Sequence, residues 1–367
     1  MKVNLIFFLA RFGLGGAGNS IFRLCTSLDK KKYKINIICL NKCAYEHKFR
    51  KNKIRVYKIK SNRTLYSMFK LKKLVKKISK NHKDTIFISN INYTNILCAL
   101  FIEKKPNLKL IAIEKTPFQE LEIYFDTIDF IKKNIIKILI CFFYNKFDKI
   151  ICNSRYISNY LRKKYNFKST TIHPPSLIYN KKKQILNKYK FDGRTLNISS
   201  ICRLSKEKAI HDILYALNYL KQKEINLNII GDGPEKENLI NLTKKLNLNK
   251  NVKFYGYKNE IFSILKKTHL YINSSYFEGF PNSVVEAAIS GIPIISSQSH
   301  GGINEILMNG KFGTIYGKGY LDLASKIKKF YQNPKIFYQK AILARKNVMK
   351  FSLLNHKKNF EKMLDNI

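Results

Sequence analysis

Two carboxylates flank a single turn in the stretch YFEGFPNSVVEAA, residues 276–288. The apolar run before it predicts a strand that ends at Ser275, and a helix is expected to follow the turn. Glu278 then lies on the loop after the strand, and Glu286 lies about one turn into the helix, roughly 6 Å along its axis. Carboxylates accept hydrogen bonds from hydroxyls and helix N-terminal amides bind phosphate, so this arrangement suits a polyhydroxyl ligand that carries phosphate.

Each of these acids also has a simpler interpretation. Asn282 or Ser283 is expected to cap the helix, and Glu286 in its first turns would then stabilise the helix dipole by roughly 0.3–1 kcal/mol. Glu278 alone could be a solvated loop acid. The functional interpretation therefore depends on cations at a neighbouring strand end.

Two cations follow such a strand in CRLSKEKAIHDILYAL, where Arg203 ends the strand and Lys208 precedes a helix. A departing diphosphate gains negative charge as its bond breaks, and fixed cations stabilise that charge. Arg also binds two phosphate oxygens at once. The alternative is two solvated bases in a Lys-rich chain. The next strand leads into IIGDGPEKENL, where Gly231 begins a turn at the same sheet edge.

A glycine-rich loop follows the first strand, in RFGLGGAGNS. Gly13, Gly15 and Gly18 match G-x-G-x-x-G between a strand and a helix, which indicates phosphate near a helix N-terminus. A nicotinamide cofactor would require an acid after the second strand, but that strand ends in Leu40-Asn41-Lys42. The dehydrogenase interpretation is therefore weakened, and a tight turn that needs glycine is the structural alternative.

The elements that must position these residues are short apolar strands alternating with amphipathic helices. Six strands are expected in each half: VNLIFFLA, KINIICL, IRVYKI, TIFISN, LKLIAIE and KIICNS, then TLNISSICR, INLNIIGD, VKFYG, HLYINSS, IPIISS and GTIYG. Such runs are typical of parallel sheets covered on both faces. We expect two doubly wound domains that divide between His173 and Arg194, with ligands beyond the carboxyl ends of the strands.

Composition sets further limits. The 367 residues suit two domains, and the net charge of +45 favours polyanionic partners. Lysines occur all along the chain rather than in one arm, so nucleic acid is not predicted as a partner. The seven cysteines form no C-x-x-C pair, and those inside apolar runs (Cys39, Cys141, Cys152 and Cys202) predict reduced, mostly buried thiols in a cytoplasmic protein. The apolar start is interrupted by Arg11, which favours a buried strand over a signal peptide, and no spanning helix is expected.

Together these segments resemble the retaining, nucleotide-sugar-dependent glycosyltransferases of family 4. EGFPNSVVE is similar to their E-x₇-E motif, CRLSKEK to G-R-L-x-x-x-K with Cys202 in place of Gly, and IIGDGP and SHGGINEIL to further segments. The resemblance implies an α/β GT-B fold, in which two doubly wound Rossmann-like domains place parallel sheets facing across a cleft. Residues 1–175 would bind the acceptor, with a C-terminal helix at 351–367 packing back on them, and residues 190–350 would bind the nucleotide sugar.

The resemblance also implies roles for individual residues. Glu286 would hold the ribose, and Glu278 with the Gly279 and Phe280 amides would hold the sugar. Arg203 and Lys208 would bind the diphosphate. Gly15 and Gly16 would let the acceptor domain approach it, although Gly18 replaces the usual Glu of the family's turn. The implied donor-binding positions are Gly15, Gly16, Arg203, Lys208, Gly231, Ser275, Glu278, Gly279, Phe280, Pro281, Asn282 and Glu286.

The chemistry implied is transfer of a sugar from a nucleotide diphosphate to a hydroxyl with retention of configuration. The catalytic positions would be Glu278, Arg203, Lys208 and Lys115. Family members often carry a histidine near Lys115, where this chain reads IAIEKTPF, and Glu114 is the other possible substitute. No D-x-D occurs, so we expect no metal and no cofactor beyond the co-substrate. A UDP-sugar is favoured as donor, with UDP-N-acetylhexosamines preferred over GDP-mannose.

The acceptor implied by the resemblance is a glycan or a lipid-linked sugar in bacterial cell-surface polysaccharide synthesis. Two basic amphipathic stretches, TLYSMFKLKKLVKKISK and FIKKNIIKILICFFYNKF, suit either an anionic membrane surface or ordinary core packing. We expect a cytoplasmic protein that is peripheral on the inner face of the cytoplasmic membrane. The alternatives are a basic membrane- or nucleic-acid-binding module that has lost catalysis, and a nucleotide-sugar epimerase.

Overall fold

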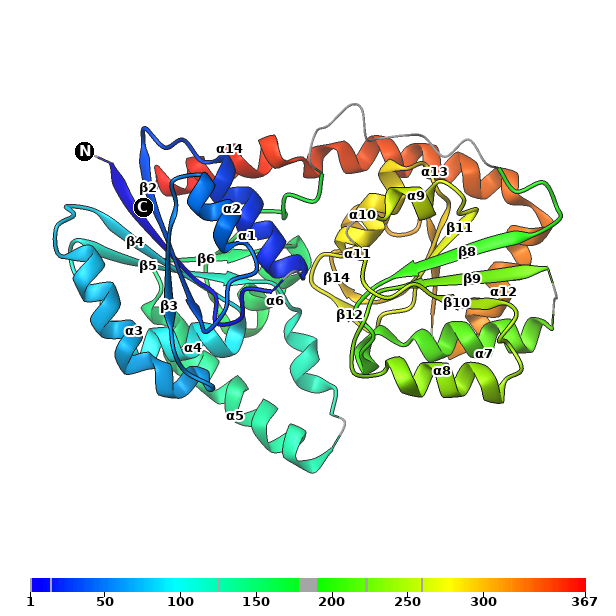
Figure 1. The fold of residues 1–367 in the computed structure, drawn as a ribbon, viewed down its shortest axis with the longest axis horizontal. Helices are drawn as coiled ribbons and strands as arrows, with labels where there is room; N and C mark the ends of the chain where they lie inside the picture. The colour runs from blue at the N-terminus through cyan, green and yellow to red at the C-terminus, as the bar shows by residue number, and fades with distance from the viewer. Residues whose placement is uncertain are drawn as a thin grey trace. The chain divides into compact units, whose positions relative to one another are not determined.

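The computed structural model describes residues 2–13, 15–124, 126–177, 190–221, 224–258, 260–317 and 319–367. The chain divides into two compact units (Figure 1). The N-terminal unit comprises Met1–Pro175 together with Leu353–Ile367, and the C-terminal unit comprises Ser176–Ser352. The Lys-rich segment in which we expected the domain divide lies largely outside the described residues.

The N-terminal unit is a seven-stranded parallel sheet in the order β3-β2-β1-β4-β5-β6-β7. Its strands are β1 (Val3–Phe8), β2 (Tyr33–Leu40), β3 (Arg55–Ile59), β4 (Thr85–Asn90), β5 (Leu108–Glu114), β6 (Lys149–Cys152) and β7 (Ser169–Thr171). Its helices are α1 (Gly16–Ser27), α2 (Glu46–Lys51), α3 (Thr64–Ser79), α4 (Asn92–Phe101), α5 (Thr127–Phe143), α6 (Arg155–Tyr165) and α14 (Leu353–Leu364).

Alternate residues of each strand enter two different cores, one on each face of this sheet. Ile6 and Phe8 of β1 pack with apolar residues of α3, α4, α5 and α6. Leu5 and Phe7 pack with α1, α2 and α14, and Phe360 of α14 stacks on Phe7 at 6.2 Å between ring centroids. Burial on both faces explains why these strands read as continuous apolar runs.

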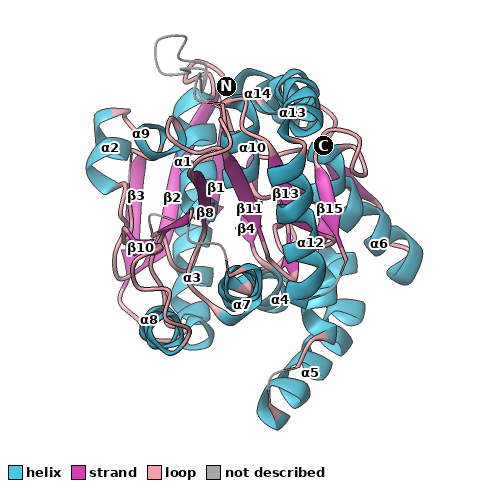
Figure 2. Ribbon diagram, turned by 90° about the vertical axis from the view of Figure 1, so that its right-hand side faces the viewer, coloured by secondary structure: helices cyan, strands magenta, loops and turns pink. Residues whose placement is uncertain are grey.

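The C-terminal unit has a six-stranded parallel sheet in the order β10-β9-β8-β11-β13-β15. Its strands are β8 (Leu196–Ile201), β9 (Ile225–Ile230), β10 (Val252–Phe254), β11 (Leu270–Asn273), β13 (Ile294–Ser297) and β15 (Thr314–Tyr316), with a separate short pair of β12 (Phe277–Glu278) and β14 (His300–Gly301). Its helices are α7 (Ile210–Leu220), α8 (Lys236–Lys245), α9 (Phe262–Leu265), α10 (Asn282–Ile289), α11 (Ile303–Leu307), α12 (Gly319–Gln332) and α13 (Pro334–Val348). Figure 2 shows the parallel strands with helices on both sides.

Both sheets share one topology. In each, the second and then the third strand lie on one side of the first strand, and the fourth and later strands lie on the other side. This is the strand order of doubly wound nucleotide-binding folds, in which the crevice between the first and fourth strands receives the ligand. The predicted α/β class with two doubly wound domains is confirmed.

Two local expectations are wrong. Neither Asn282 nor Ser283 caps α10: Pro281 occupies the cap position without a side-chain hydrogen bond, and Asn282 is already the first helical residue. Cys141 is exposed on α5 instead of buried, and Cys202 is half-buried. Cys39 and Cys152 are buried as expected, and all seven cysteines are free thiols. Among the described residues, no helix is long and apolar enough to cross a bilayer.

Candidate functional site

The strand order of the C-terminal unit places the loops after β8 and β11 side by side. β8 is the first strand and β11 is the fourth, and they pair directly through Leu270 with Ile198 and Tyr271 with Ser199. The loop after β8 carries Arg203 and Lys208, and the loop after β11 carries Glu278. The loops that carry these predicted residues therefore meet at the crevice position of this sheet.

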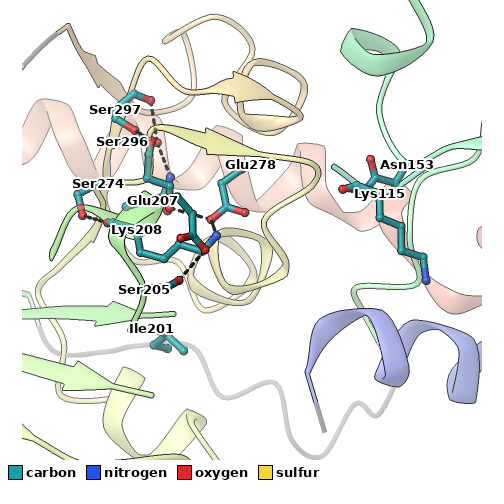
Figure 3. Close-up of polar contacts among 12 residues, drawn as sticks. Lys115, Asn153, Ile201, Ser205, Glu207, Lys208, Ser274, Glu278, Ser296 and Ser297 are labelled. Carbon is teal, nitrogen blue, oxygen red and sulfur yellow. Dashed lines mark hydrogen bonds and ion pairs between the residues drawn. The ribbon is translucent and has the colours of Figure 1, made fainter. Parts of the chain in front are cut away.

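Hydrogen bonds join the two loops at the backbone. Ser274 Oγ donates to the Lys208 carbonyl at 2.7 Å, and the Tyr276 amide donates to the Glu207 carbonyl at 2.9 Å. Ser205 Oγ donates to the Glu207 carboxylate at 2.5 Å (Figure 3). The cation-bearing loop is thus held against the acid-bearing loop by contacts that do not use the Lys208 ammonium.

Lys208 and Glu278 form an ion pair at the centre of these loops. Lys208 Nζ lies 2.7 Å from Glu278 Oε1, which also accepts from Ser275 Oγ at 2.8 Å (Figure 3). The side chains are only 17% and 15% exposed. Burial opposes the charge of Lys208, but the Glu278 carboxylate outweighs burial and raises the pKa of the lysine. The ammonium is therefore charged at neutral pH and ready to bind an anion.

Arg203 lies near the start of the loop that follows β8, five residues before Lys208, and its side chain is exposed. Backbone hydrogen bonds from the end of β9 and the loop after it hold the backbone around Arg203 in place. The Leu204 amide donates to the Asp232 carbonyl at 3.0 Å, and the Cys202 amide donates to the Ile230 carbonyl at 3.1 Å. Gly231 adopts a φ of 143°, and a Cβ there would lie 1.8 Å from the Cys202 carbonyl oxygen. Only glycine fits, so Gly231 supports the backbone that carries Arg203.

Glu286 lies on α10, one helical turn after Asn282, and is half-buried. Asn282 Oδ1 accepts a hydrogen bond from Ser176 Oγ at 2.6 Å, which fixes the first turn of the helix. The segment Gly279–Pro281 joins β12 to α10. The Gly302 amide donates to the Gly279 carbonyl at 3.0 Å, and a Cβ at Gly302 would lie 2.6 Å from the Phe280 ring. The segment SHGG, residues 299–302, therefore packs closely against the loop that follows Glu278.

Two serines that sequence analysis did not assign also stabilise this site. Ser274 holds the Lys208 backbone, as described above, and Ser297 at the end of β13 donates to the Ser275 carbonyl at 2.5 Å. Figure 3 shows Ser297 on the neighbouring strand end. Their signal in the sequence is the serine pair that closes each apolar run, in INSS and IISS.

In the N-terminal unit, the glycine loop meets the first turn of α1. Gly15 is the cap residue of that helix, without a side-chain hydrogen bond, and Gly16 begins it. A Cβ at Gly15 would have no atom within 4 Å, whereas a Cβ at Gly18 would lie 2.3 Å from the Gly13 carbonyl oxygen. In this loop conformation a side chain at Gly18 would therefore clash with the Gly13 backbone.

Glu114 ends β5 and Lys115 follows it, and their side chains lie on opposite faces of the sheet, against Asn95 of α4 and Ala17 of α1. Glu114 is fully buried, and its carboxylate accepts from Asn95 at 2.5 Å and from the Tyr144 hydroxyl. Burial raises the pKa of Glu114 to about 7, against the lowering effect of those hydrogen bonds. Because it is enclosed within the core, Glu114 is a structural acid.

Lys115 is the more accessible of the two. Its ammonium donates to the Ala17 carbonyl of α1 at 3.3 Å, and part of its surface is exposed. Burial lowers the pKa of Lys115 to about 7, with a small opposing effect from Cys25. Asn153 Nδ2 donates to the Lys115 carbonyl at 2.9 Å (Figure 3). Lys115 can therefore exchange a proton near neutral pH, beside the glycine loop.

Two family models match the chain. One, described as "Glycosyltransferase Family 4", matches residues 14–178, and the other, "Glycosyl transferases group 1", matches residues 181–347. The O-antigen biosynthesis glycosyltransferase WclY of Escherichia coli is 28% identical over 206 residues, 55% of this chain. The chain spans about half of that relative's length, 57%.

Two further matches extend over most or all of the chain. The Campylobacter jejuni N-acetylgalactosamine-N,N'-diacetylbacillosaminyl-diphospho-undecaprenol 4-alpha-N-acetylgalactosaminyltransferase is 25% identical over 331 residues, 84% of each chain. The solved structure of Anabaena HepE in complex with UDP-glucose superposes with a TM-score of 0.78 at 15% identity and covers 100% of both chains.

The two doubly wound sheets and this structural likeness define a protein of the GT-B fold. The chain belongs to the family 4 type of glycosyltransferases, because the two family models together take in most of it. The family, the fold and the enzyme class expected from the sequence are confirmed at this level.

Proposed function

We propose that this protein transfers a sugar from a nucleotide diphosphate, with a UDP-sugar as donor, to a hydroxyl of a glycan or lipid-linked acceptor. The proposal places it in bacterial cell-surface polysaccharide synthesis. The name of the WclY relative refers to O-antigen biosynthesis, that of the Campylobacter relative refers to diphospho-undecaprenol, and HepE is bound to UDP-glucose. A UDP-N-acetylhexosamine is the preferred donor, and the anomeric configuration is retained.

The observation that carries this proposal is the Lys208–Glu278 pair at the crevice between β8 and β11, with exposed Arg203 on the same loop as Lys208. The diphosphate would bind Arg203 and take over Lys208 from Glu278. The Glu278 carboxylate would then accept hydrogen bonds from the hydroxyls of the donor sugar, and the Gly279 and Phe280 amides would donate to its oxygens. Fixed cations stabilise the charge that develops on the departing diphosphate, so the reaction proceeds without a metal.

Other predicted residues complete the division of roles. Glu286 binds the ribose hydroxyls, and Gly15 and Gly16 are the backbone positions of the N-terminal unit that we assign to the diphosphate. The bond between the sugar carbon and the phosphate oxygen breaks as the acceptor oxygen bonds to that carbon. The acceptor proton passes to the departing phosphate, and Lys115, with its lowered pKa, is the candidate catalytic side chain of the N-terminal unit.

A thermal-shift panel of UDP, GDP and ADP tests the donor. We expect UDP to raise the melting temperature of the wild-type protein most, and the Glu286→Ala variant to lose that shift. A guanosine-selective shift would overturn the donor preference. Incubating UDP-N-acetylglucosamine with the protein, without acceptor, tests the epimerase alternative, which requires release of an altered nucleotide sugar.

We further propose that the protein is peripheral on the inner face of the cytoplasmic membrane and that α5 contacts the lipid. One stripe of α5, at helical spacing, is apolar and 50–71% exposed: Ile128, Ile131, Ile135, Ile138 and Phe142. The opposite side of α5 already supplies the core contacts, through Ile140 and its partly buried neighbours. Both ribbon views show α5 extending outward from its unit (Figures 1 and 2).

The lysines of α5 suit an anionic headgroup layer. Lys132 is exposed on the same helix, so the apolar stripe has a cation beside it. Such a helix binds in the interface plane through buried apolar area and attraction to anionic lipid.

Sedimentation with phosphatidylglycerol-containing vesicles measures this binding. We expect Ile131→Ser/Ile138→Ser to weaken it severalfold. Ile336→Ser/Ile342→Ser, at isoleucines that are equally exposed on α13, is the matched control. Equal binding by wild type and both variants would contradict the role of α5.

A further inference from the structure

The N-terminal unit contains a cavity of about 1040 Å³ at the carboxyl end of its sheet. It is lined by the segments that follow β1, β2 and β3, by the start of α3, and by Tyr93 at the start of α4. This is the edge of the sheet where doubly wound folds bind ligands. None of the donor residues proposed above lines it, so this cavity is a separate site.

Positive charge dominates the lining. Arg11, Lys42 and Arg63 face the cavity, and none of them has a carboxylate partner among the residues that the structure describes. A fourth cation, Lys58, lies 2.9 Å from Glu46, the acid of the lining. Three cations are therefore uncompensated around one cavity, and a ligand with more than one negative charge fits this balance best.

The rim is held rigid by reciprocal hydrogen bonds between two strand ends. Asn41 Nδ2 donates to the Ser61 carbonyl at 2.7 Å, and the Ser61 amide donates to Asn41 Oδ1 at 3.0 Å. Ser61 Oγ also donates to the Arg63 carbonyl at 2.8 Å. The backbones that carry Lys42 and Arg63 are thus fixed relative to each other before any ligand binds, which lowers the entropy cost of binding.

An apolar and aromatic edge borders the cations. Leu65, Tyr66 and Tyr93 line the cavity and are 43%, 67% and 44% exposed. Just before Tyr93, Ile91 adopts a φ of 77°, a conformation that is strained for a β-branched residue and that tends to occur at functional sites. The cavity therefore offers cations for phosphate next to surfaces for a sugar ring or a hydrocarbon chain.

We infer that this cavity binds the phosphate or diphosphate group of the acceptor, through Arg11, Lys42 and Arg63. The inference rests on the proposed function, because it specifies the acceptor of that reaction as a phosphorylated one. The phosphate can belong to a lipid-linked sugar or to a free sugar phosphate, and Leu65 and Tyr66 would contact a lipid chain only in the first case.

Calorimetric titration with inorganic pyrophosphate, in the presence of saturating UDP, tests this site. UDP fills the donor site, so the pyrophosphate that binds must bind elsewhere. We expect Arg11→Gln/Lys42→Gln/Arg63→Gln to weaken pyrophosphate binding at least tenfold. The control is Lys2→Gln/Lys31→Gln/Lys32→Gln, which removes the same charge from exposed lysines at the amino ends of β1 and β2.

Equal weakening in both triple variants, or no pyrophosphate binding by the wild type, would overturn the inference. Geranyl diphosphate distinguishes the two sources of phosphate. Tighter binding than pyrophosphate, lost in Tyr66→Ala, assigns a lipid-linked acceptor, whereas equal binding assigns a free phosphate. UDP binding in the same titrations reports on the proposed function separately, so the acceptor site can fail while the donor site stands.

Discussion

Removing the Glu278 carboxylate tests whether the ion pair between Lys208 and Glu278 stabilises the folded C-terminal unit. In Glu278→Ala the Lys208 ammonium stays largely buried, with its partner gone. Loss of one member of a buried pair costs about 3–5 kcal/mol, because the remaining charge is uncompensated. For a domain of this size about 1 kcal/mol shifts the melting temperature by roughly 2–4 °C, so we expect the C-terminal unit to melt about 6–20 °C lower.

Differential scanning calorimetry measures this change. Glu237→Ala, which removes an exposed carboxylate on α8, is the control and should change the stability by less than about 0.5 kcal/mol. The double variant Lys208→Met/Glu278→Leu leaves no unpaired charge and should recover much of the loss, without recovering sugar transfer. If Glu278→Ala melts like the wild type, or the double variant melts no higher than Glu278→Ala, the reasoning is refuted.

Three further predictions concern other parts of the chain. Gly231→Ala should destabilise the protein by several kcal/mol, because the new Cβ would clash with the Cys202 carbonyl. Gly193 also has a positive φ but open space around it, so Gly193→Ala should cost only about 1–3 kcal/mol of backbone strain. Equal melting temperatures of the two variants would contradict this. Burial raises the pKa of Glu114 to about 7, from 4.5, so the folded state binds more protons than the unfolded state between these values. Stability should therefore fall by up to about 3 kcal/mol as the pH rises from 4.5 to 7, and denaturation of Glu114→Gln should show no such fall. EDTA should leave the rate of sugar transfer unchanged. If EDTA abolishes activity and added Mg²⁺ restores it, the cationic side chains alone do not stabilise the departing diphosphate.

The strands, and the meeting of two strand ends in the C-terminal unit, could be predicted from the sequence for a physical reason. Both faces of each sheet are buried, so β4 (TIFISN) and β5 (LKLIAIE) read as mostly apolar runs whose limits match the structure. Because parallel strands end at one edge, residues after two different strands could be expected to meet there. Arg203, Lys208 and Glu278 were predicted in this way.

Other features depend on tertiary contacts that no local pattern carries. Asn282 is a good capping residue by type, but its side chain bonds Ser176, 106 positions away. Cys141 lies in an apolar run, but that run is a helix with an exposed apolar stripe. The cavity of the N-terminal unit is formed by residues from four separate strand ends, so its charge balance emerged only with the fold.

Titration of UDP into the Arg203→Gln variant tests the central claim most directly. Arg203 is exposed, so the substitution should leave the fold intact, and Arg194→Gln, at an arginine that is 89% exposed in the same unit, is the matched control. Loss of charge-assisted hydrogen bonds should weaken UDP binding about 10- to 100-fold in Arg203→Gln and leave it unchanged in Arg194→Gln. Equal UDP affinity in the wild type and both variants would contradict a donor site between β8 and β11.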